Sequence, residues 1–546
     1  MTEKSSAPAL STDPIHYRVD IDAPNTHRFR VTLTGLQARQ GRSPRVVTRQ
    51  LDKCTWQIEC SPTRPLVVSY EVYARDNSVR AAWLDADRGF FNGTSLCLRV
   101  EGQEQAAHSL EVPVPKAVTA WSLATGLTPQ RIDKRGFGTY VAGSYDELVD
   151  CPVEMGAFWS GTFTACGVPH RFVVRFWHGG KPPPFARYLF MLNAVDDGYG
   201  GLEHRNSTAL ICNRKDLPRT GELKVSEGYT TLRGLISHEY FHTWNVKRLR
   251  PAAFENYDYE RENYTPLLWF FEGFTSYYDD LLLRRAGLLD NAGYLKLLNK
   301  TINQVMQSPG RLVQSVAEAS FDAWVKYYRQ DENTPNVTVS YYTKGALVAM
   351  CFDLTLRDAS GHDATLDDAM RALWVRCKAG PMTEADFAGV LETLGHRSFA
   401  PELAQWVHGR DELPLKSLLV QHGVGVLDEP AQLAHRLGLR VTESQGVQIK
   451  TVLRGGAAER AGFAPGDEWL GVEPWSRSGA APAGGWRMGR LDDLNLYAGS
   501  ARKVTALVAR DQRLIRLELD MPPAMNTWRL VVQDAALLER WLNPNA

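Results

Sequence analysis

Residues 236–244 read Ile-Ser-His-Glu-Tyr-Phe-His-Thr-Trp and lie in a stretch with helical periodicity. His238 and His242 are four residues apart, so on a helix both imidazoles leave from the same face and can bind one metal ion. Glu239 lies beside them, where its carboxylate can take a proton from a metal-activated water. The alternative is an ordinary helix that carries two incidental histidines.

A hydrolytic zinc site needs a third protein ligand and an open position for water. Residues 267–282 predict a second helix, and one carboxylate, Glu272, lies within the apolar run at its start. A lone buried glutamate is costly unless it is paired or metal-bound, so Glu272 is the predicted third ligand, with a salt-bridged core glutamate as the alternative. Asp279 falls on the same face and can orient a ligand histidine. A solvated acidic face shared with Asp280 is the favoured reading of Asp279.

The composition bounds the class of protein. The chain has 546 residues, enough for about three domains, and 44% of them are hydrophobic. Lys+Arg and Asp+Glu are both 62, so the charge balance gives no indication of nucleic acid or an anionic membrane as a partner. No apolar stretch reaches membrane-spanning length, and residues 1–14 lack the apolar core of a secretory signal. The 8 cysteines form no C-x-x-C pair, which favours a reduced, cytoplasmic protein.

The hydrophobic pattern changes along the chain. Residues 17–153 predict a β-sandwich-like domain, with short strands at 27–33, 66–73 and 95–100. Strands are predicted again at 171–176, 188–192 and 208–212, and helices dominate from 229 to 419, which fits an α+β metallopeptidase. Residues 446–472 predict strand, turn, short helix, turn and strand, and residues 534–541 a terminal amphipathic helix.

Residues 238–251, followed by residues 269–278, resemble the glycyl aminopeptidase family of gluzincin (HExxH) zinc metallopeptidases. The resemblance implies a multidomain α+β chain: a β-rich, sandwich-like N-terminal domain over 1–165, a thermolysin-like peptidase domain over 166–420, a PDZ domain over 421–522 and a C-terminal segment over 523–546. It also implies one zinc ion bound by His238, His242 and Glu272, with Glu239 as the general base.

Two further segments resemble motifs of the wider gluzincin aminopeptidases. Gly200-Gly-Leu-Glu-His resembles the Gly-x-Met-Glu-Asn strand, whose glutamate holds the free amine of the substrate; that role falls on Glu203, although Leu202 and His204 depart from the pattern. Residues 341–345 resemble the Tyr-x-Lys-Gly segment, whose tyrosine donates a hydrogen bond to the oxyanion. The match falls on Tyr342, with the adjacent Tyr341 as a competitor and a packing tyrosine as the alternative.

Residues 446–472 are similar to PDZ domains, notably in Ala457-Glu-Arg-Ala-Gly and Pro465-Gly-Asp. Such domains accept a C-terminal peptide as an added strand, and residues 437–441 resemble, less closely than the turn motif, the loop that holds its carboxylate and the strand that follows. A domain that only packs on the catalytic domain is the alternative.

The sequence therefore predicts a zinc-dependent aminopeptidase that acts on peptides with a free N-terminus, and the family resemblance implies a preference for small N-terminal residues, glycine or alanine. Two alternatives stay open: a zinc endopeptidase with substrates recruited by the PDZ domain, and a non-catalytic PDZ scaffold on a metallopeptidase fold. Glu203 argues against the first, and the presence of His238, Glu239, His242 and Glu272 against the second.

Overall fold

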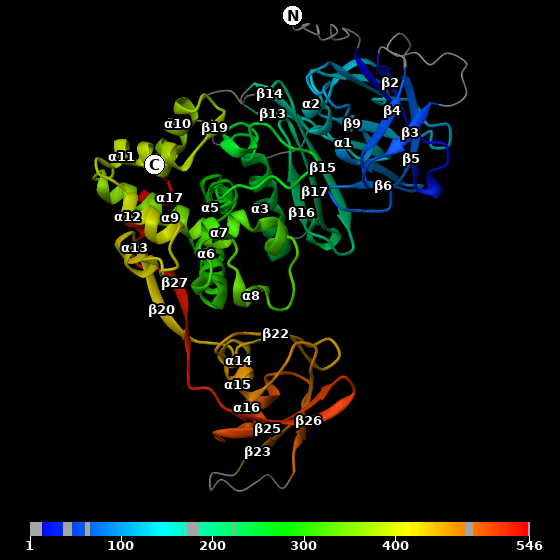
Figure 1. Cartoon of the computed structure of the whole chain (residues 1–546). Helices are drawn as coiled ribbons and strands as arrows, with labels where there is room; N and C mark the ends of the chain where they lie inside the picture. The colour runs from blue at the N-terminus through cyan, green and yellow to red at the C-terminus, as the bar shows by residue number, and fades with distance from the viewer. Residues whose placement is uncertain are drawn as a thin grey trace, which may run out of the picture. The chain divides into compact units, whose positions relative to one another are not determined.

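The computed structural model describes residues 14–36, 46–60, 66–165, 167–171, 185–221, 224–475 and 484–543. The chain divides into two compact units, residues 1–243 and 244–546. Figure 1 labels their helices and strands.

The first unit begins with two β-sheets around one hydrophobic core. The core includes Tyr17, Phe29, Phe91, Trp121 and Met155, all nearly inaccessible to solvent. The larger sheet has the order β10-β11-β8-β1-β2-β5 and the smaller the order β6-β7-β12-β9. The strands are β1 (Ile15–Asp20), β2 (Arg28–Leu36), β5 (Leu66–Tyr73), β6 (Ala82–Leu84), β7 (Arg88–Phe91), β8 (His108–Val112), β9 (Ser122–Thr125), β10 (Thr128–Ile132), β11 (Gly138–Ala142) and β12 (Val153–Gly156), with a separate β3 (Val47–Gln50) and β4 (Trp56–Glu59) hairpin. The predicted β-rich N-terminal domain is confirmed, as are its strands at 27–33 and 66–73.

The strand predicted at residues 95–100 is wrong. The chain there forms a short helix, α1 (Gly93–Leu96), and then runs without regular structure. Tyrosine hydroxyls take the place of a partner strand: Tyr70 donates to the carbonyl of Leu96, Tyr145 to that of Cys97 at 2.7 Å, and Tyr17 to that of Leu98 at 2.6 Å. Because side chains distant in sequence satisfy these carbonyls, local β propensity does not decide the conformation.

The rest of the first unit is a five-stranded sheet with a long helix. The sheet has the order β13-β14-β15-β17-β16, from β13 (Phe163–Ala165), β14 (Val168–Arg171), β15 (Tyr188–Val195), β17 (Ser207–Asn213) and β16 (Gly200–Glu203), so β16 is an edge strand. The strands predicted at 188–192 and 208–212 are confirmed, whereas residues 172–176 lie outside the described residues. Helix α2 (Tyr145–Val149) precedes the sheet, and helix α3 (Glu227–Phe241) follows it. The Ser226 side chain caps α3 by accepting the N–H of Tyr229 at 3.0 Å.

The second unit begins with the predicted helical region. Its helices are α4 (Leu268–Phe271), α5 (Gly273–Arg285), α6 (Asn291–Met306), α7 (Val316–Phe321), α8 (Thr334–Val337), α9 (Thr343–Ala359), α10 (Leu366–Arg376), α11 (Glu384–Gly395), α12 (Ala400–Glu402) and α13 (Leu415–Gln421), with a π-helical turn over Ala323–Tyr327. Two short strands, β18 (Arg250–Pro251) and β19 (Pro381–Met382), pair in parallel. Helix α9 is buried along nearly its whole length, so it forms the centre of this region.

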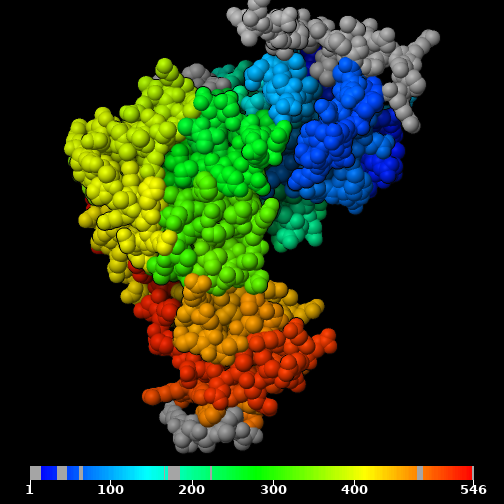
Figure 2. All heavy atoms as spheres, viewed as in Figure 1, coloured from blue at the N-terminus to red at the C-terminus, as the bar shows by residue number. Residues whose placement is uncertain are grey.

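The C-terminal part of the second unit is mostly sheet. Strand β20 (Val424–Pro430) pairs with β27 (Asn526–Val532) and leads to a sheet built from β21 (Leu439–Thr442), β22 (Val447–Val452), β23 (Glu468–Pro474), β24 (Trp486–Arg487), β25 (Lys503–Arg510) and β26 (Arg513–Asp520). With the helices α14 (Leu433–Leu437), α15 (Ala457–Ala461) and α16 (Asp493–Ala498), this sheet forms the compact block coloured orange to red in Figure 2. The strand–helix–strand order predicted for 446–472 is confirmed.

The terminal helix is also confirmed as α17 (Ala535–Leu542), which packs on α5 through a hydrogen bond from Trp541 Nε1 to the Tyr277 hydroxyl at 3.0 Å. Among the helices in the described ranges, none combines the length and the apolar character that a bilayer crossing requires.

Candidate metal centre and active site

The C-terminal end of α3 carries the two histidines of the motif. His238 lies in the last helical turn, and His242 is the residue that ends the helix, with its N–H donated to the carbonyl of His238 at 3.2 Å. The two imidazole rings have centroids 4.7 Å apart and are nearly perpendicular at 85°. His242 is 1% exposed and His238 is half-buried. The i, i+4 spacing therefore places both rings together, as the helical pattern predicts.

Glu272 occupies the junction between α4 and α5 and is half-buried. One ligand atom from each of His238, His242 and Glu272 lies within 4.8 Å of the other two. Two imidazole nitrogens and one carboxylate oxygen are the donor set of many hydrolytic zinc sites. The residues present therefore fit a zinc ion in both chemistry and spacing.

Glu239 is buried between the motif helix and the edge strand β16. It is 5% exposed. A Cβ atom added to Gly201 would lie 2.1 Å from Glu239 Oε1 and 2.2 Å from its Cδ, so the strand approaches the carboxylate as closely as a residue without a side chain allows. The glycine of Gly-Gly-Leu-Glu thus sets the position of the Glu239 carboxylate, which the sequence did not reveal.

Glu203 lies two residues beyond Gly201 on β16 and is half-buried. Side chains alternate along a strand, so Glu203 shares the face of Gly201 that meets Glu239, whereas Leu202 faces the other way and packs on a cluster that includes Met191. His204 stands where the Gly-x-Met-Glu-Asn motif has asparagine. The structure explains this difference, because His204 is buried and its Nδ1 lies 3.3 Å from Oδ1 of Asp150.

Tyr341 and Tyr342 immediately precede α9 and differ in accessibility. Tyr341 is 0% exposed, whereas Tyr342 is half-buried and its hydroxyl lies 3.3 Å from the hydroxyl of Tyr328. The two rings stack with centroids 4.8 Å apart. Burial, together with the nearby Glu272 carboxylate, raises the pKa of Tyr342 well above its usual value. A phenol already keeps its proton at neutral pH, and this shift acts in the same direction, so Tyr342 is available as a hydrogen-bond donor.

Two glycines, Gly273 and Gly345, let the start of α5 and the start of α9 pack closely, which brings Glu272 near Tyr342 within the second unit. A Cβ atom on Gly273 would lie 2.6 Å from the backbone of Gly345, and one on Gly345 would lie 2.8 Å from the carbonyl of Trp269. Only glycine allows the start of α5 to approach the first turn of α9 this closely. Gly273 follows Glu272 and Gly345 follows Tyr342 by three residues, so this contact fixes the spacing of the two candidate site residues.

Asn245, which was not predicted to belong to the site, is fully buried three residues after His242. Its Nδ2 donates to the carbonyl of Phe271 at 3.1 Å and to Oγ1 of Thr275 at 3.2 Å. Those two bonds tie the turn after the motif to the helices on either side of Glu272. In the sequence, only its position in the run Thr-Trp-Asn directly after the second histidine could have indicated that Asn245 supports the site.

Asp279 lies on α5, where its Oδ1 accepts the backbone N–H of Asp280 at 2.6 Å. This local bond does not distinguish between the two roles predicted for Asp279.

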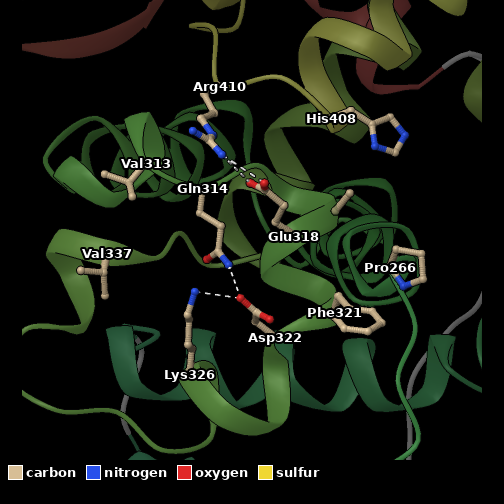
Figure 3. A pocket seen from close by; sticks show the side chains of 11 residues that line it. Pro266, Val313, Gln314, Glu318, Phe321, Asp322, Lys326, Val337, His408 and Arg410 are labelled. Atoms are coloured by element: carbon tan, nitrogen blue, oxygen red, sulfur yellow. Dashed lines mark hydrogen bonds and ion pairs between the residues drawn. The ribbon is translucent and has the colours of Figure 1, made fainter.

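A cavity of about 430 Å³ lies in the second unit, beside α7 and the π-helical turn (Figure 3). Its charged side chains already bind one another: Glu318 contacts Arg410, and Asp322 contacts both Lys326 and Gln314. None of the candidate metal ligands lines it. The cavity is therefore distinct from the metal centre, and its charges are neutralised internally.

Comparisons with known proteins agree with this fold. Residues 231–348 match the family model described as M61 glycyl aminopeptidase, and residues 33–157 match the peptidase M61 N-terminal domain. A crystal structure of an aminopeptidase N family protein from Idiomarina loihiensis is 32% identical over 97% of this chain and 100% of its own, with a TM-score of 0.87. The chain is thus a peptidase of the aminopeptidase class. It belongs to the M61 glycyl aminopeptidase family.

Other likenesses are weaker. An M1 zinc metallopeptidase mutant from Deinococcus radiodurans is 15% identical over 74% of this chain and 95% of its own, with a TM-score of 0.45. Aminopeptidase A from Legionella pneumophila is 12% identical over 96% of this chain and 59% of its own, with a TM-score of 0.46. TM-scores this low carry no inference about the chain. A search of curated proteins found no match.

Proposed function

We propose that the protein is a zinc-dependent aminopeptidase that hydrolyses small N-terminal residues, glycine or alanine, from peptides. The observation that carries the proposal is the convergence of ligand atoms from His238, His242 and Glu272 within 4.8 Å of one another. A zinc ion held by them would supply Lewis acidity, polarising the scissile carbonyl and acidifying a water molecule. The preference for small residues is taken from the family to which the chain belongs.

Glu239 is the proposed general base. It adjoins His238 in sequence, and its carboxylate is buried against Gly201. In this position it accepts a proton from the attacking water and then gives that proton to the leaving amine.

Tyr342 is the proposed donor to the developing oxyanion. A tyrosine phenol is a hydrogen-bond donor at neutral pH, and Tyr342 is partly exposed where Tyr341 is not. A hydrogen bond that forms mainly in the transition state lowers the barrier without tightening substrate binding.

Glu203 is the proposed anchor for the substrate's α-ammonium. It shares a strand face with Gly201, and β16 is an edge strand whose outer side has no neighbour within the described sheet. An extended peptide can add to such an edge. A carboxylate at the end of the strand then pairs with the N-terminus, so cleavage falls after the first residue.

The remaining proposals concern the chain as a whole. We retain the division at residues 165, 420 and 522, with a PDZ domain over 421–522 and a cytoplasmic location. Strand β21 lies at an edge of its sheet and follows Gly438 in a left-handed conformation (φ 74°), as suits a carboxylate-binding loop and added strand. Its ligand would be a C-terminal peptide.

The test is hydrolysis of glycyl and alanyl anilides, with free and with N-acetylated amines, before and after removal of metal by a chelator. The proposal expects cleavage of the free-amine substrates only, lost on chelation and restored by zinc. Glu203→Ala should lower kcat/KM about ten- to hundredfold, the value of one charge-assisted hydrogen bond. Equal cleavage of free and N-acetylated substrates by the wild type would refute the aminopeptidase assignment in favour of an endopeptidase. A protein that holds zinc and cleaves neither would support the scaffold.

A further inference from the structure

A second group of metal-ligating side chains lies in the second unit, away from the residues already described. Asp358 is in the last turn of α9, His362 follows in the turn after that helix, and His422 is the residue that ends α13. One ligand atom from each lies within 4.8 Å of the other two. We propose that these three residues form a second zinc site, with a structural role.

The hydrogen bonding of His422 leaves one ring nitrogen suited to a metal. The residue is 5% exposed. Its Nδ1 lies 2.9 Å from the carbonyl oxygen of Leu418, which can only accept, so Nδ1 carries the proton. In the neutral ring Nε2 then presents a lone pair, and this buried atom makes no hydrogen bond with any described residue. A backbone carbonyl that fixes the histidine tautomer in this way is a common support for a metal ligand.

The spacing of His422 and Asp358 matches a shared cation. Nε2 of His422 lies 3.4 Å from Oδ1 of Asp358, close enough for two electron-rich atoms to repel each other unless a positive charge lies between them. Two ligands bound about 2.1 Å from a tetrahedral zinc ion stand roughly 3.4 Å apart. A proton on Nε2 is the competing source of positive charge, and the experiment below separates the two.

His362 supplies the third ligand from an unusual backbone position. Its φ is 71°, in the left-handed region that few residues other than glycine adopt. The conformation turns the chain back after α9, and the His362 ring reaches a centroid distance of 6.2 Å from that of His422. His362 and Asp358 are exposed, so a water molecule has access to the fourth position of a tetrahedral ion.

A zinc ion at this site would tie the end of α9 to the end of α13. Helix α9 begins directly after Tyr342, and His422 is followed by Gly423 and then by β20, the strand that leads to the C-terminal sheet. Because the cluster lies at the opposite end of α9 from Tyr342, zinc there should stabilise the fold and leave hydrolysis unchanged.

The test counts zinc by elemental analysis in the purified full-length protein, after dialysis against micromolar Zn²⁺. We expect two zinc ions per wild-type chain and one in His362→Asn, because asparagine tolerates the left-handed backbone but is a poor zinc ligand. His396→Asn is the matched control: His396 also has a positive φ, 54°, and is exposed, but belongs to no metal group among the described residues. It should keep two.

A His242→Ala background separates this site from the catalytic centre. We expect one zinc ion per chain in His242→Ala and in the double variant with His396→Asn, and none in the double variant with His362→Asn. Added zinc should raise the Tm of His242→Ala and of its His396→Asn derivative, but not of the His362→Asn double variant. Anilide hydrolysis should be the same in His362→Asn and in wild type.

A single zinc ion in wild type that is lost in His242→Ala would overturn the second site. Equal zinc content in His362→Asn and His396→Asn would overturn it as well. Neither result bears on the proposed aminopeptidase activity, whose failure would appear as an inactive wild type.

Discussion

Gly201→Ala should inactivate the enzyme while leaving its fold and its metal in place. The new Cβ would lie 2.1 Å from Oε1, 2.2 Å from Cδ and 2.5 Å from Cγ of Glu239, distances at which atoms overlap. All three are atoms of one side chain, so the overlap is relieved most easily by rotation of Glu239 rather than by movement of β16.

The size of the effect follows from that displacement. Relief of the overlap moves the carboxylate by about 1 Å or more, and a misplacement of about 1 Å in a catalytic group costs roughly 10²-fold in rate. The three atoms nearest to this Cβ all belong to Glu239, so the steric overlap falls on the proposed base and not on the candidate metal ligands His238, His242 and Glu272. We therefore expect a loss in kcat of about a hundredfold, with unchanged zinc content and little change in Tm.

The assay is steady-state hydrolysis of alanyl anilide, with zinc content and thermal unfolding measured on the same preparation. Gly489→Ala is the control, because a Cβ there would meet, among the described residues, only Oδ2 of Asp493 at an ordinary contact distance of 3.7 Å, and Gly489 is not among the glycines with a positive φ. A Gly201→Ala enzyme with wild-type kcat would show that Glu239 does not act from the position described here.

Two further substitutions test other parts of the account. Tyr342→Phe should lower kcat with little change in KM, whereas Tyr341→Phe, at a fully buried position, should leave kcat nearly unchanged; steady-state kinetics on both decides which tyrosine acts. The second substitution concerns Asp353, which is 2% exposed. Burial alone would raise its pKa, but Arg357, the Tyr277 hydroxyl and the N–H of Leu366 hold the pKa below its usual value. This contribution to stability is present above the unfolded pKa, near 4, and is lost as the pH falls through the lower folded value. Denaturant unfolding should show that the wild type loses stability in that acid range. In Asp353→Ala the Arg357 charge stays buried without its carboxylate partner, so this variant should be less stable than the wild type by about 3–5 kcal/mol at pH 7. Its stability should also depend less on acid pH. Equal stability of the two proteins at pH 7 would contradict the role of this pair.

The sequence predicted those features that depend on local spacing. The four-residue interval places His238 and His242 together because α3 is a helix, and a single carboxylate in an apolar run pointed to Glu272. Short runs of β-branched, aromatic or other apolar residues were also enough to predict β2, β5, β15 and β17.

Features that depend on contacts between distant segments could not be predicted. Three tyrosine hydroxyls determine the conformation of residues 96–98, and Gly201 positions Glu239 from 38 residues earlier in the chain. The approach of Gly273 to Gly345 and the meeting of His362 with His422 likewise appear only when the chain is folded. In each case the interacting residues share no periodic pattern in sequence.

The most direct test of the central claim, that this is a zinc peptidase with Glu239 as its base, is the turnover of Glu239→Gln with its zinc content measured alongside. Glutamine keeps the shape of the side chain but cannot accept the proton. The account predicts the zinc content of the wild type and a loss of turnover of roughly 10²–10⁴-fold or more on a glycyl or alanyl anilide. Turnover near that of the wild type in a fully zinc-loaded variant would contradict it.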